Sequence, residues 1–536
     1  MWYFWRGFVK IKADQFFLKQ PRITCNGRSD FATNNLLFSV YYFIKENCTS
    51  MTSTDQFNAT FLGLVNFEGK YLTAEKFGNQ INVTGTSLRS KQMWCFEQTE
   101  TSTKVYLKSP NSNYLETTKT GDALCESKEK SNNFIFDVDI NEEGQWTFKD
   151  CFGKYLCGNS ERLYTQPKVL DEALWSIHIA SHPQCCILSI SRKRYVVSEN
   201  GELCANEDVA WGQNAVITVE YQCGKYALRD SSGKYLNGNT GKLDDKFSKD
   251  SWFTIHIYGN MYGLRSSNGK YLTTHGPNGK LIASKQVVGK DEQFIFNESK
   301  AQCLLLANNG KKLSIRQGID VTANQFLEPE DTETFQIDFC NGEIDKVTFL
   351  ARTAKFWRAS DKSITATATE ITVNSVFKLE WNSEKVALKS FNGKYLVSSS
   401  GGQLSPVGES PSDVNALFTL VLVNRPIIVF RGENGYIGMI SSTNKIQCNR
   451  GIHDAMQVLE CAGKYRLKTV FGKFWKIDAD FCLIADEGNG DLFHFQLYGK
   501  NKMMICAENG KFLQGDNNGV IKAIGTAAIS STLWEY

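Results

Sequence analysis

The chain has 536 residues, which is enough for roughly three to five domains. Its 60 basic and 57 acidic residues leave a net charge of +3, which excludes a global polycation of the kind that binds nucleic acid. No run approaches 18 apolar residues, so we expect no membrane insertion. The 16 cysteines contain no C-x-x-C pair, which favours a reducing, cytoplasmic compartment.

The first part of the chain differs in character from the rest. Residues 1–54 are rich in aromatic side chains and lie outside any repeat. Met51 is followed by a polar stretch that resembles a start, Thr52-Ser53-Thr54-Asp55. We therefore expect residues 1–54 to be a leader that is disordered or absent from the native protein, with the functional chain beginning at Met51.

After this leader, one short pattern recurs twelve times with a mean period of about 40 residues. Each unit begins with an apolar residue, namely Leu64, Leu107, Phe148, Leu188, Leu228, Leu264, Leu305, Phe349, Leu388, Val429, Leu467 and Ile505. Seven residues later stands an aromatic, except for Lys312: Tyr71, Tyr114, Tyr155, Tyr195, Tyr235, Tyr271, Phe356, Tyr395, Tyr436, Phe474 and Phe512. The next position is apolar in every unit, so the repeat indicates a regular architecture.

Each unit contains a predicted β-hairpin. In the fifth unit Tyr226, Leu228 and Asp230 alternate as in a half-buried strand, and Gly233 supplies a turn before the return strand at Tyr235. Alternating apolar pairs, such as Trp94 with Phe96, add a further strand per unit. About four short strands per unit leave two candidates, a β-propeller or a set of β-trefoils.

The number of units decides between the two. Three units close one trefoil, so twelve divide into four trefoils, whereas a twelve-bladed propeller is improbable and the Gly-His and Trp-Asp signature of WD-type blades is missing. The sequence therefore predicts an all-β fold of four tandem β-trefoil domains. We expect these at residues 55–183, 184–298, 299–424 and 425–536.

Several long strings are similar to one family. They are Lys70-Tyr-Leu-Thr-Ala-Glu75, Ser191-Arg-Lys-Arg-Tyr195, Arg316-Gln-Gly318, Asn424-Arg-Pro-Ile-Ile-Val-Phe-Arg-Gly-Glu433 and Leu533-Trp-Glu-Tyr536. The chain resembles fascin, the actin-bundling protein, over nearly all of residues 55–536. The resemblance implies a cytosolic monomer that crosslinks filamentous actin into tight parallel bundles in filopodia and microvillus-like protrusions.

No motif in the sequence indicates an enzyme. No P-loop, G-x-S-x-G or strand-linked G-x-G-x-x-G motif is present, and His178 and His182 lack Cys, Asp or Glu at metal-ligand spacing. We interpret the chain as a non-enzyme without cofactors. The alternative is a lectin-like trefoil that binds carbohydrate, but the Gln-x-Trp motif of such lectins occurs only once, at Gln92-Met-Trp94.

Bundling by a monomer needs at least two filament-binding faces, each basic because the filament is acidic. The resemblance implies a first face, hereafter face 1, that comprises Lys70, Glu75, Arg89, Lys91, Lys473 and Lys511. Four positions of the fourth trefoil depart from the family. Asn434 replaces a common His, Gln514 replaces a frequent Lys, and Ile440 and Ser441 lie where basic residues are common. These departures weaken the share of the fourth trefoil in face 1.

A second basic cluster is expected around Arg192, Lys193 and Arg194, where three cations replace the usual Gly-Lys hairpin tip. Burying several cations in a row would cost several kcal/mol per ion, so we expect them to be exposed and to have no structural role. Three further residues match basic positions of the family. Together the six form face 2: Arg192, Lys193, Arg194, Lys285, Lys290 and Arg316.

Ser87 lies two residues before Arg89, in a context that suits a basophilic kinase. The resemblance implies phosphorylation of Ser87 by a kinase of the protein kinase C type. A phosphate would add a charge of about −1.5 to −2 to face 1 and would weaken its attraction to the acidic filament.

Overall fold

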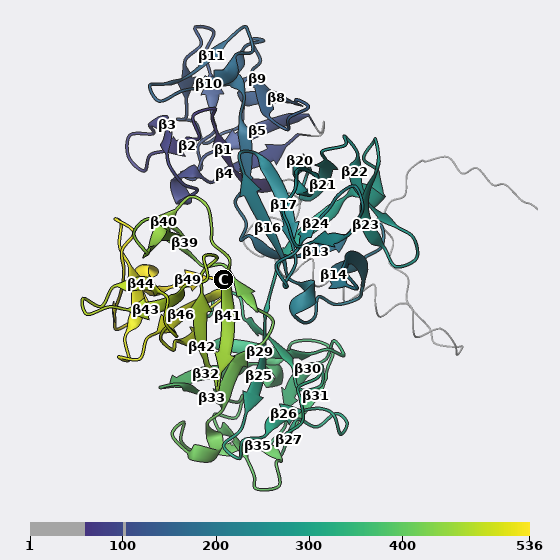
Figure 1. Ribbon diagram of the computed structural model, residues 1–536, viewed down its shortest axis with the longest axis vertical. Helices are drawn as coiled ribbons and strands as arrows, with labels where there is room; N and C mark the ends of the chain where they lie inside the picture. The colour runs from purple at the N-terminus through teal and green to yellow at the C-terminus, as the bar shows by residue number, and fades with distance from the viewer. Residues whose placement is uncertain (1–58, 100–102) are drawn as a thin grey trace, which may run out of the picture. The chain divides into compact units, whose positions relative to one another are not determined.

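A computed structural model describes residues 59–99 and 103–536 (Figure 1). The expectations for residues 1–54 and for a start at Met51 lie outside these residues. Within the described residues the strands form four large sheets of 10, 12, 12 and 13 strands and one two-stranded ribbon, all antiparallel where paired. The predicted all-β fold of four tandem β-trefoils is confirmed.

The first trefoil closes by pairing its first strand with its last. Its elements are β1 (Ala59–Val65), β2 (Tyr71–Ala74), β3 (Ile81–Gly85), the 3₁₀ turn η1 (Ser90–Gln92), β4 (Trp94–Gln98), β5 (Lys104–Lys108), β6 (Glu116–Thr117), β7 (Ala123–Leu124), η2 (Asn132–Phe134), β8 (Ile135–Ile140), β9 (Trp146–Lys149), β10 (Tyr155–Gly158), β11 (Leu163–Gln166), η3 (Asp171–Ala173) and β12 (Ser176–Ile179). The strands β1, β4, β5, β8, β9 and β12 pair in a ring, in which Leu62 faces Ile179 and a bridge joins Trp146 to Trp175. The hairpins β2–β3, β6–β7 and β10–β11 complete the three units.

The second trefoil repeats this ring with every pairing made by named strands. It comprises β13 (Gln184–Ser189), β14 (Arg194–Glu199), β15 (Glu202–Glu207), η4 (Gln213–Ala215), β16 (Ile217–Gln222), β17 (Lys225–Arg229), β18 (Tyr235–Leu236), β19 (Leu243–Asp244), η5 (Lys249–Ser251), β20 (Phe253–Tyr258), β21 (Met261–Ser266), β22 (Tyr271–His275), β23 (Lys280–Lys285), η6 (Lys290–Glu292) and β24 (Phe294–Glu298). The ring runs β13–β16–β17–β20–β21–β24 and returns to β13.

The third trefoil contains β25 (Ala301–Leu306), β26 (Lys312–Ser314), β27 (Thr322–Gln325), β28 (Phe335–Phe339), β29 (Lys346–Ala351), β30 (Phe356–Ala359), β31 (Ile364–Ala368), η7 (Val373–Ser375), β32 (Phe377–Asn382), β33 (Lys385–Lys389), β34 (Tyr395–Ser398), β35 (Leu404–Gly408), η8 (Val414–Ala416) and β36 (Thr419–Leu422). Its ring closes where β25 pairs with β36, from Cys303 opposite Leu422 to Leu306 opposite Thr419.

In the fourth trefoil the first barrel strand is split into β37 and β38. Its elements are β37 (Ile427–Ile428), β38 (Arg431–Gly432), β39 (Gly435–Ile440), β40 (Lys445–Arg450), β41 (Met456–Cys461), β42 (Lys464–Lys468), β43 (Phe474–Ile477), β44 (Leu483–Asp486), β45 (His494–Leu497), β46 (Lys502–Cys506), β47 (Phe512–Gly515), β48 (Ile521–Gly525), η9 (Ser530–Thr532) and β49 (Trp534–Glu535). Here β37 pairs with β41, and β38 pairs with β49, so both ends of the split strand take part in the closed barrel.

The repeat residues fill the barrels. The apolar residue that follows each aromatic position is fully buried in all twelve units: Leu72, Leu115, Leu156, Val196, Leu236, Leu272, Leu313, Trp357, Leu396, Ile437, Trp475 and Leu513. Eleven of the twelve leading apolar residues are fully buried as well, ten of them in the barrel cores. A side-chain period of two along a strand requires this, because one face of each barrel strand points to the core. The eleventh, Val429, lies in a separate small cluster, because its neighbours Ile428 and Phe430 take the core positions.

The fourth unit is an exception, because the sequence pattern assigned its core position to the residue after the correct one. Leu188 is only half-buried, and Ile187 takes the core position instead. The cause is a longer hairpin tip, in which Tyr195 faces Leu188 and Lys193 adopts a left-handed φ of 55°. A one-residue shift in register exchanges the two faces of a strand.

The trefoils share hydrophobic cores in pairs. One continuous cluster of buried side chains runs from Leu62 to Phe294, and a second runs from Ala301 to Tyr536. We call trefoils 1 and 2 the N-terminal pair and trefoils 3 and 4 the C-terminal pair. Each pair is therefore held together largely by apolar burial.

Candidate functional site

Face 1 contains an ion pair on the first trefoil. Lys91 Nζ lies 2.6 Å from Glu75 Oε2, next to the end of β2, and Asn82 donates a second hydrogen bond to the same carboxylate. These interactions, led by the hydrogen bond from Lys91, lower the pKa of Glu75. Because Glu75 offsets the charge of Lys91, the pair contributes little net positive charge to face 1.

Ser87 and Arg89 lie against the fourth trefoil. Arg89 Nε donates a hydrogen bond of 3.0 Å to Ser87 Oγ, and Ser87 is only 2% exposed. A Cβ added to Gly451, which follows β40, would lie 2.9 Å from the carbonyl oxygen of Thr86. Burial raises the pKa of the Cys448 thiol on β40 to about 12, and the positive charge of Arg89 opposes that shift. The structure thus brings residues 86–89 and 448–451 together, and Ser87 is covered rather than displayed on an open turn.

The other residues of face 1 occupy separate hairpin tips. Lys70 closes the β1–β2 tip, where its backbone amide donates to Asn66 Oδ1. Lys473, between β42 and β43, has its ammonium 3.1 Å from both Asn444 Oδ1 and Glu487 Oε1. Lys511 is exposed between β46 and β47.

The family departures can also be located. Asn434 is buried, and its amide nitrogen donates to the carbonyl oxygen of Asp516. Gln514 lies on β47 opposite Lys522 of β48, and Ile440 ends β39 opposite Lys445. Two lysines therefore stand across the strands from positions where this chain lacks a basic residue.

The cluster at residues 192–194 has a structural role, contrary to our expectation. Arg192 donates hydrogen bonds through its guanidinium to the carbonyl oxygens of Gly276 and Pro277 in the β22–β23 turn. Arg194 forms an ion pair with Asp208. Lys193 is exposed at the tip. The expectation failed because the acceptors of Arg192 come from another hairpin of the same trefoil.

The remaining residues of face 2 divide into exposed and paired cations. Lys285 at the end of β23 and Lys290 at the start of η6 are exposed. Arg316 instead makes a bidentate contact with Glu333, whose side chain is completely buried, with Nη2 2.6 Å from Oε2 and Nε 3.2 Å from Oε1. Burial tends to raise the pKa of Glu333, but the hydrogen bonds from Arg316 and Ser314 outweigh it and lower the pKa.

Arg316 is linked to the 192–194 cluster through ion pairs that the sequence did not reveal. Arg352 on trefoil 3 pairs with Glu207 at the end of β15 on trefoil 2, and its Nε lies 3.8 Å from Asp331. Ion pairs therefore extend across the two trefoils from Arg194 to Asp208, from Glu207 to Arg352, from Arg352 to Asp331 and from Glu330 to Arg316, and the steps between them are acids adjacent in the chain. In the sequence, the neighbouring acidic residues at 207–208 and 330–331 could have indicated these ion pairs.

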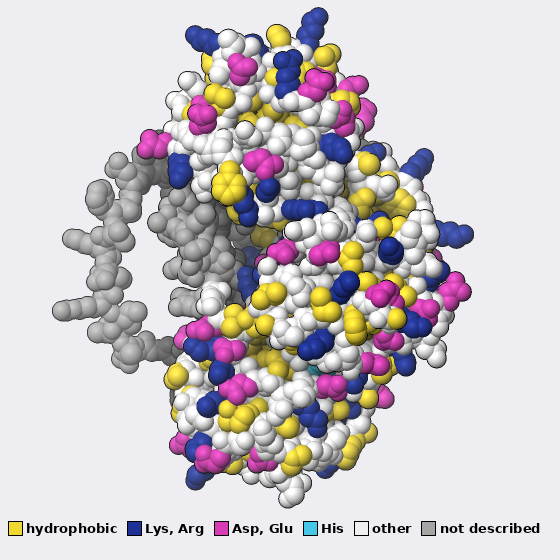
Figure 2. Space-filling model, turned by 90° about the vertical axis from the view of Figure 1, so that its left-hand side faces the viewer, with side chains coloured by type: hydrophobic (Ala, Val, Ile, Leu, Met, Phe, Trp, Pro, Cys, Tyr) yellow, Lys and Arg dark blue, Asp and Glu magenta, His cyan; other side chains and the backbone are white. Residues whose placement is uncertain are grey.

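Charged side chains of both signs are interspersed on the surface. Figure 2 shows one face on which lysine and arginine side chains alternate with acidic ones rather than gathering in a single basic field. Among residues 59–99 and 103–536, no group of three or more His, Cys, Asp or Glu side chains could hold a metal ion. In the same residues no helix is long and apolar enough to cross a membrane.

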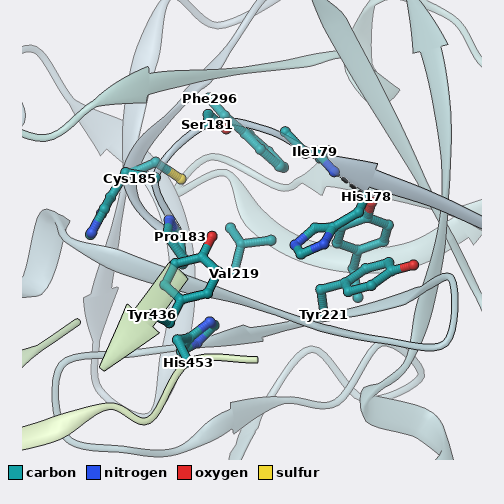
Figure 3. Close-up of a pocket in the computed structure, with 12 residues that line it drawn as sticks. His178, Ile179, Ser181, Pro183, Cys185, Val219, Tyr221, Phe296, Tyr436 and His453 are labelled. Carbon is teal, nitrogen blue, oxygen red and sulfur yellow. Dashed lines mark hydrogen bonds between the residues drawn. The ribbon is translucent and has the colours of Figure 1, made fainter. Parts of the chain in front are cut away.

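A small cavity lies where trefoils 1, 2 and 4 meet (Figure 3). Its volume is about 20 Å³, which is room for about one water molecule. The ring of His178 stacks on Tyr221 with centroids 3.9 Å apart, and Tyr71 Oη lies 2.8 Å from His178 Nδ1. His453 from the fourth trefoil reaches the same cavity. These contacts give His178 a structural role, whereas nothing in the sequence indicated that His453 lies at the same cavity.

Next to it, a cleft of about 330 Å³ lies between trefoils 2 and 4, lined by Glu220, Arg229, Trp252, Ile452 and Asp454 among others. The carboxylate of Glu220 forms an ion pair with Arg229, whose Nη1 lies 3.2 Å from Glu220 Oε1.

Comparison with known proteins identifies the family. The Fascin domain model matches residues 68–177, 183–296, 308–420 and 433–536, which is one match in each trefoil. Fascin-2 of Bos taurus is 33% identical over 484 residues, covering 88% of this chain and 97% of the relative, and fascin of Strongylocentrotus purpuratus is 32% identical over 496 residues, covering 88% and 98%. Fascin-3 of Mus musculus is more distant, at 24% identity over 495 residues, covering 89% and 97%.

Among solved structures, a mosquitocidal holotoxin aligns over 91% of this chain and 69% of its own at 12% identity, with a TM-score of 0.22, which is too low to support any inference. The four family matches cover most of the chain and coincide with the four closed barrels. This chain therefore belongs to the fascin family of actin-bundling proteins.

Proposed function

We propose that this chain crosslinks actin filaments into tight parallel bundles through at least two filament-binding faces on one monomer, in the cytoplasm and in protrusions such as filopodia. The observation that carries the proposal is the presence of a fascin domain in each of the four trefoils. A single binding face would only decorate filaments, whereas two faces give a second contact at high effective concentration. We further propose trefoil boundaries near residues 183, 298 and 424.

For face 1 we propose that the contact between trefoils 1 and 4 supplies the filament-binding surface. Residues 86–89, including Arg89, lie on the first trefoil beside the 448–451 segment of the fourth, and Lys91 follows them in η1. Lys522 and Lys445 stand across the strands from Gln514 and Ile440. These lysines can restore part of the positive charge that the departures from the family remove.

For face 2 the structure favours a smaller set of cations than the sequence did. Lys193, Lys285 and Lys290 are exposed, whereas Arg192 holds the β22–β23 turn and Arg316 is neutralised by Glu333. We therefore propose that the three lysines bind the filament and that Arg192 joins the tip that carries Lys193 to the β22–β23 turn.

Charge reversal at the three lysines tests face 2. The variant is Lys193→Glu combined with Lys285→Glu and Lys290→Glu, and the matched control is Lys270→Glu, an exposed hairpin lysine of the same trefoil. High-speed sedimentation measures binding to single filaments, and low-speed sedimentation measures bundling. We expect the triple variant to need roughly ten times more protein for half-maximal bundling, since each exposed contact contributes ~0.2–1 kcal/mol.

Binding to single filaments should persist through face 1, and the Lys270→Glu control should bundle normally. Normal bundling by the triple variant at moderate salt would contradict the assignment of face 2. An equal loss in the control would show that the effect is not specific to these three lysines.

Phosphorylation of Ser87 by a kinase of the protein kinase C type belongs to the same proposal, with one condition. Because Ser87 is 2% exposed and lies under the segment around Gly451, the kinase can reach it only after this segment moves away. Modification would then both add negative charge and prevent the segment from returning.

A further inference from the structure

Three glutamine side chains make the same unusual contact between trefoils. Each uses its amide to bind two backbone groups of a neighbouring trefoil at once, donating to the carbonyl oxygen of one residue and accepting from the N–H two residues later. Gln98 does so with Ile257 and Gly259, at 3.3 and 2.6 Å. We call each of these arrangements a glutamine clamp.

The other two clamps have equally short bonds. Gln184 donates to the carbonyl oxygen of Ile427 at 2.8 Å and accepts from the N–H of Val429 at 2.9 Å. Gln302 donates to the carbonyl oxygen of Ala210 at 3.0 Å and accepts from the N–H of Gly212 at 2.7 Å. Both glutamines are 2% exposed, so water does not compete for these bonds.

The geometry follows from the period of an extended chain. The carbonyl of residue n and the N–H of residue n+2 point to the same edge of an extended segment, and a neighbouring strand would normally bind both. The side-chain amide carries one donor and one acceptor group side by side, so it replaces that strand. Each clamp thus fixes both the distance and the direction of the segment that it binds.

The clamps converge on the second trefoil. Gln98 joins trefoil 1 to the turn between β20 and β21, Gln184 joins the first strand of trefoil 2 to β37 of trefoil 4, and Gln302 joins trefoil 3 to the segment before η4 of trefoil 2. Trefoil 2 is therefore clamped to each of the other three. It also carries the exposed lysines of face 2.

The three clamps differ in what surrounds them. The Gln98 clamp lies within the N-terminal pair, whose two trefoils share one hydrophobic cluster. The Gln184 and Gln302 clamps connect the N-terminal pair to the C-terminal pair, and the buried hydrophobic clusters of the described residues do not extend from one pair to the other.

Several other contacts between the pairs are polar as well. They include Arg352 with Glu207, Arg431 with the carbonyl oxygen of Ala180, and Lys500 with Glu298. Ion pairs that remain partly exposed contribute little, because water and salt screen them. Unlike these contacts, each of the two buried clamps binds in a fixed direction through two hydrogen bonds.

We propose that Gln184 and Gln302 are positioning residues that hold the N-terminal and C-terminal pairs at a fixed mutual orientation. This role rests on the proposed function in one respect: bundling needs filament-binding faces on different trefoils to meet two filaments at a constant angle. A loosened junction lowers the effective concentration of the second face, while each face keeps its own affinity.

The test compares three variants of the full chain. Gln184→Leu with Gln302→Leu removes both clamps. Gln184→Glu with Gln302→Glu keeps the side-chain shape and the bond from each N–H, but places a carboxylate oxygen against each carbonyl oxygen. Gln98→Leu is the matched control, since it removes a clamp where a shared core remains.

Small-angle X-ray scattering measures how firmly the two pairs are held relative to each other, and it needs no actin. We expect a broader distribution of interatomic distances for both double variants and an unchanged one for Gln98→Leu. Circular dichroism at 20 °C should show native β-structure in all three. Unchanged scattering by both double variants would overturn the clamp role.

Sedimentation reports the functional part of the inference. We expect both double variants to require about tenfold more protein for half-maximal bundling, with binding to single filaments changed less than about threefold. Altered scattering with normal bundling would overturn the claim that bundling needs the fixed orientation. If the unaltered chain failed to bundle actin, the proposed function would be wrong, whereas the scattering result would still decide the clamp role.

Discussion

Acidification should destabilise this protein between pH 6.5 and pH 5 through its buried histidines. Burial, followed by the influence of His453 and Arg431, lowers the pKa of His178 to about 3. Burial, His182 and Arg229 lower the pKa of His453 to about 3 as well, and burial with Arg431 and Arg425 lowers that of His182 in the same direction. Figure 3 shows the rings of His178 and His453 at one small cavity.

The sign follows from proton binding. In the unfolded chain a histidine takes up a proton near pH 6.5, whereas in the folded chain it stays neutral down to about pH 3, so the unfolded state binds more protons at pH 5. Stability is therefore complete above about pH 7.5 and falls as the pH decreases through 6.5. At pH 5 the loss is about 2 kcal/mol for His178 and about the same for His453, or roughly 4 kcal/mol together.

Titratable groups other than the histidines do not cancel the loss of stability between pH 6.5 and 5. The lowered pKa values of Glu75 and Glu333 mean that their stabilising contributions disappear only below the ordinary glutamate value of 4.5. Burial raises the pKa of Asp454, which acts in the opposite direction because its protonation favours the folded state. The histidines therefore dominate between pH 6.5 and 5.

Urea unfolding followed by tryptophan fluorescence at pH 7.5 and 5.0 measures the effect. His178→Gln should be less stable than the parent at pH 7.5, because it loses the stacking on Tyr221, but should lose about 2 kcal/mol less between the two pH values. His275→Gln is the control, since His275 is exposed on β22. Equal unfolding midpoints at pH 7.5 and 5.0 for the parent chain would refute the reasoning.

Three further outcomes follow from individual contacts. Gly451→Ala should push its segment off the first trefoil and increase the rate at which protein kinase C phosphorylates Ser87 in vitro, and an unchanged rate would show that the segment does not cover the site. Trp357→Ala should cost about 3–5 kcal/mol in urea unfolding because its side chain is completely buried, and a loss below about 1 kcal/mol would contradict the packing. Glu333→Gln should cost roughly 1–3 kcal/mol at pH 7 by weakening the pair with Arg316. This difference should shrink as the pH falls from the ordinary glutamate value of 4.5 through the lowered pKa of Glu333, and a difference that is constant with pH would argue against the pair.

Much of the fold could be predicted because the repeat is periodic. Residues such as Leu72 and Leu513 occupy the same barrel position in every unit, so the period alone indicated closed three-unit barrels. The shift at Leu188 could not be predicted, because it depends on the turn geometry at Lys193. Lys193 has a left-handed φ, and this position is not a glycine that would have indicated such a turn.

The candidate site was less predictable because its contacts join distant segments. Arg192 looked like a free cation, but its acceptors belong to a turn 84 and 85 residues later. Ser87 lies in a stretch that suits a kinase, but the fourth trefoil covers it. Nothing in the sequence indicated that Gln184 contacts another trefoil, since a glutamine that begins a strand normally faces water.

The central claim is that one monomer holds two filament-binding faces. Electron microscopy of the low-speed pellet formed by the unaltered chain and preformed actin filaments tests it most directly. The account predicts tight bundles of parallel filaments with a constant spacing. Filaments that are decorated but single, with no low-speed pellet, would contradict it.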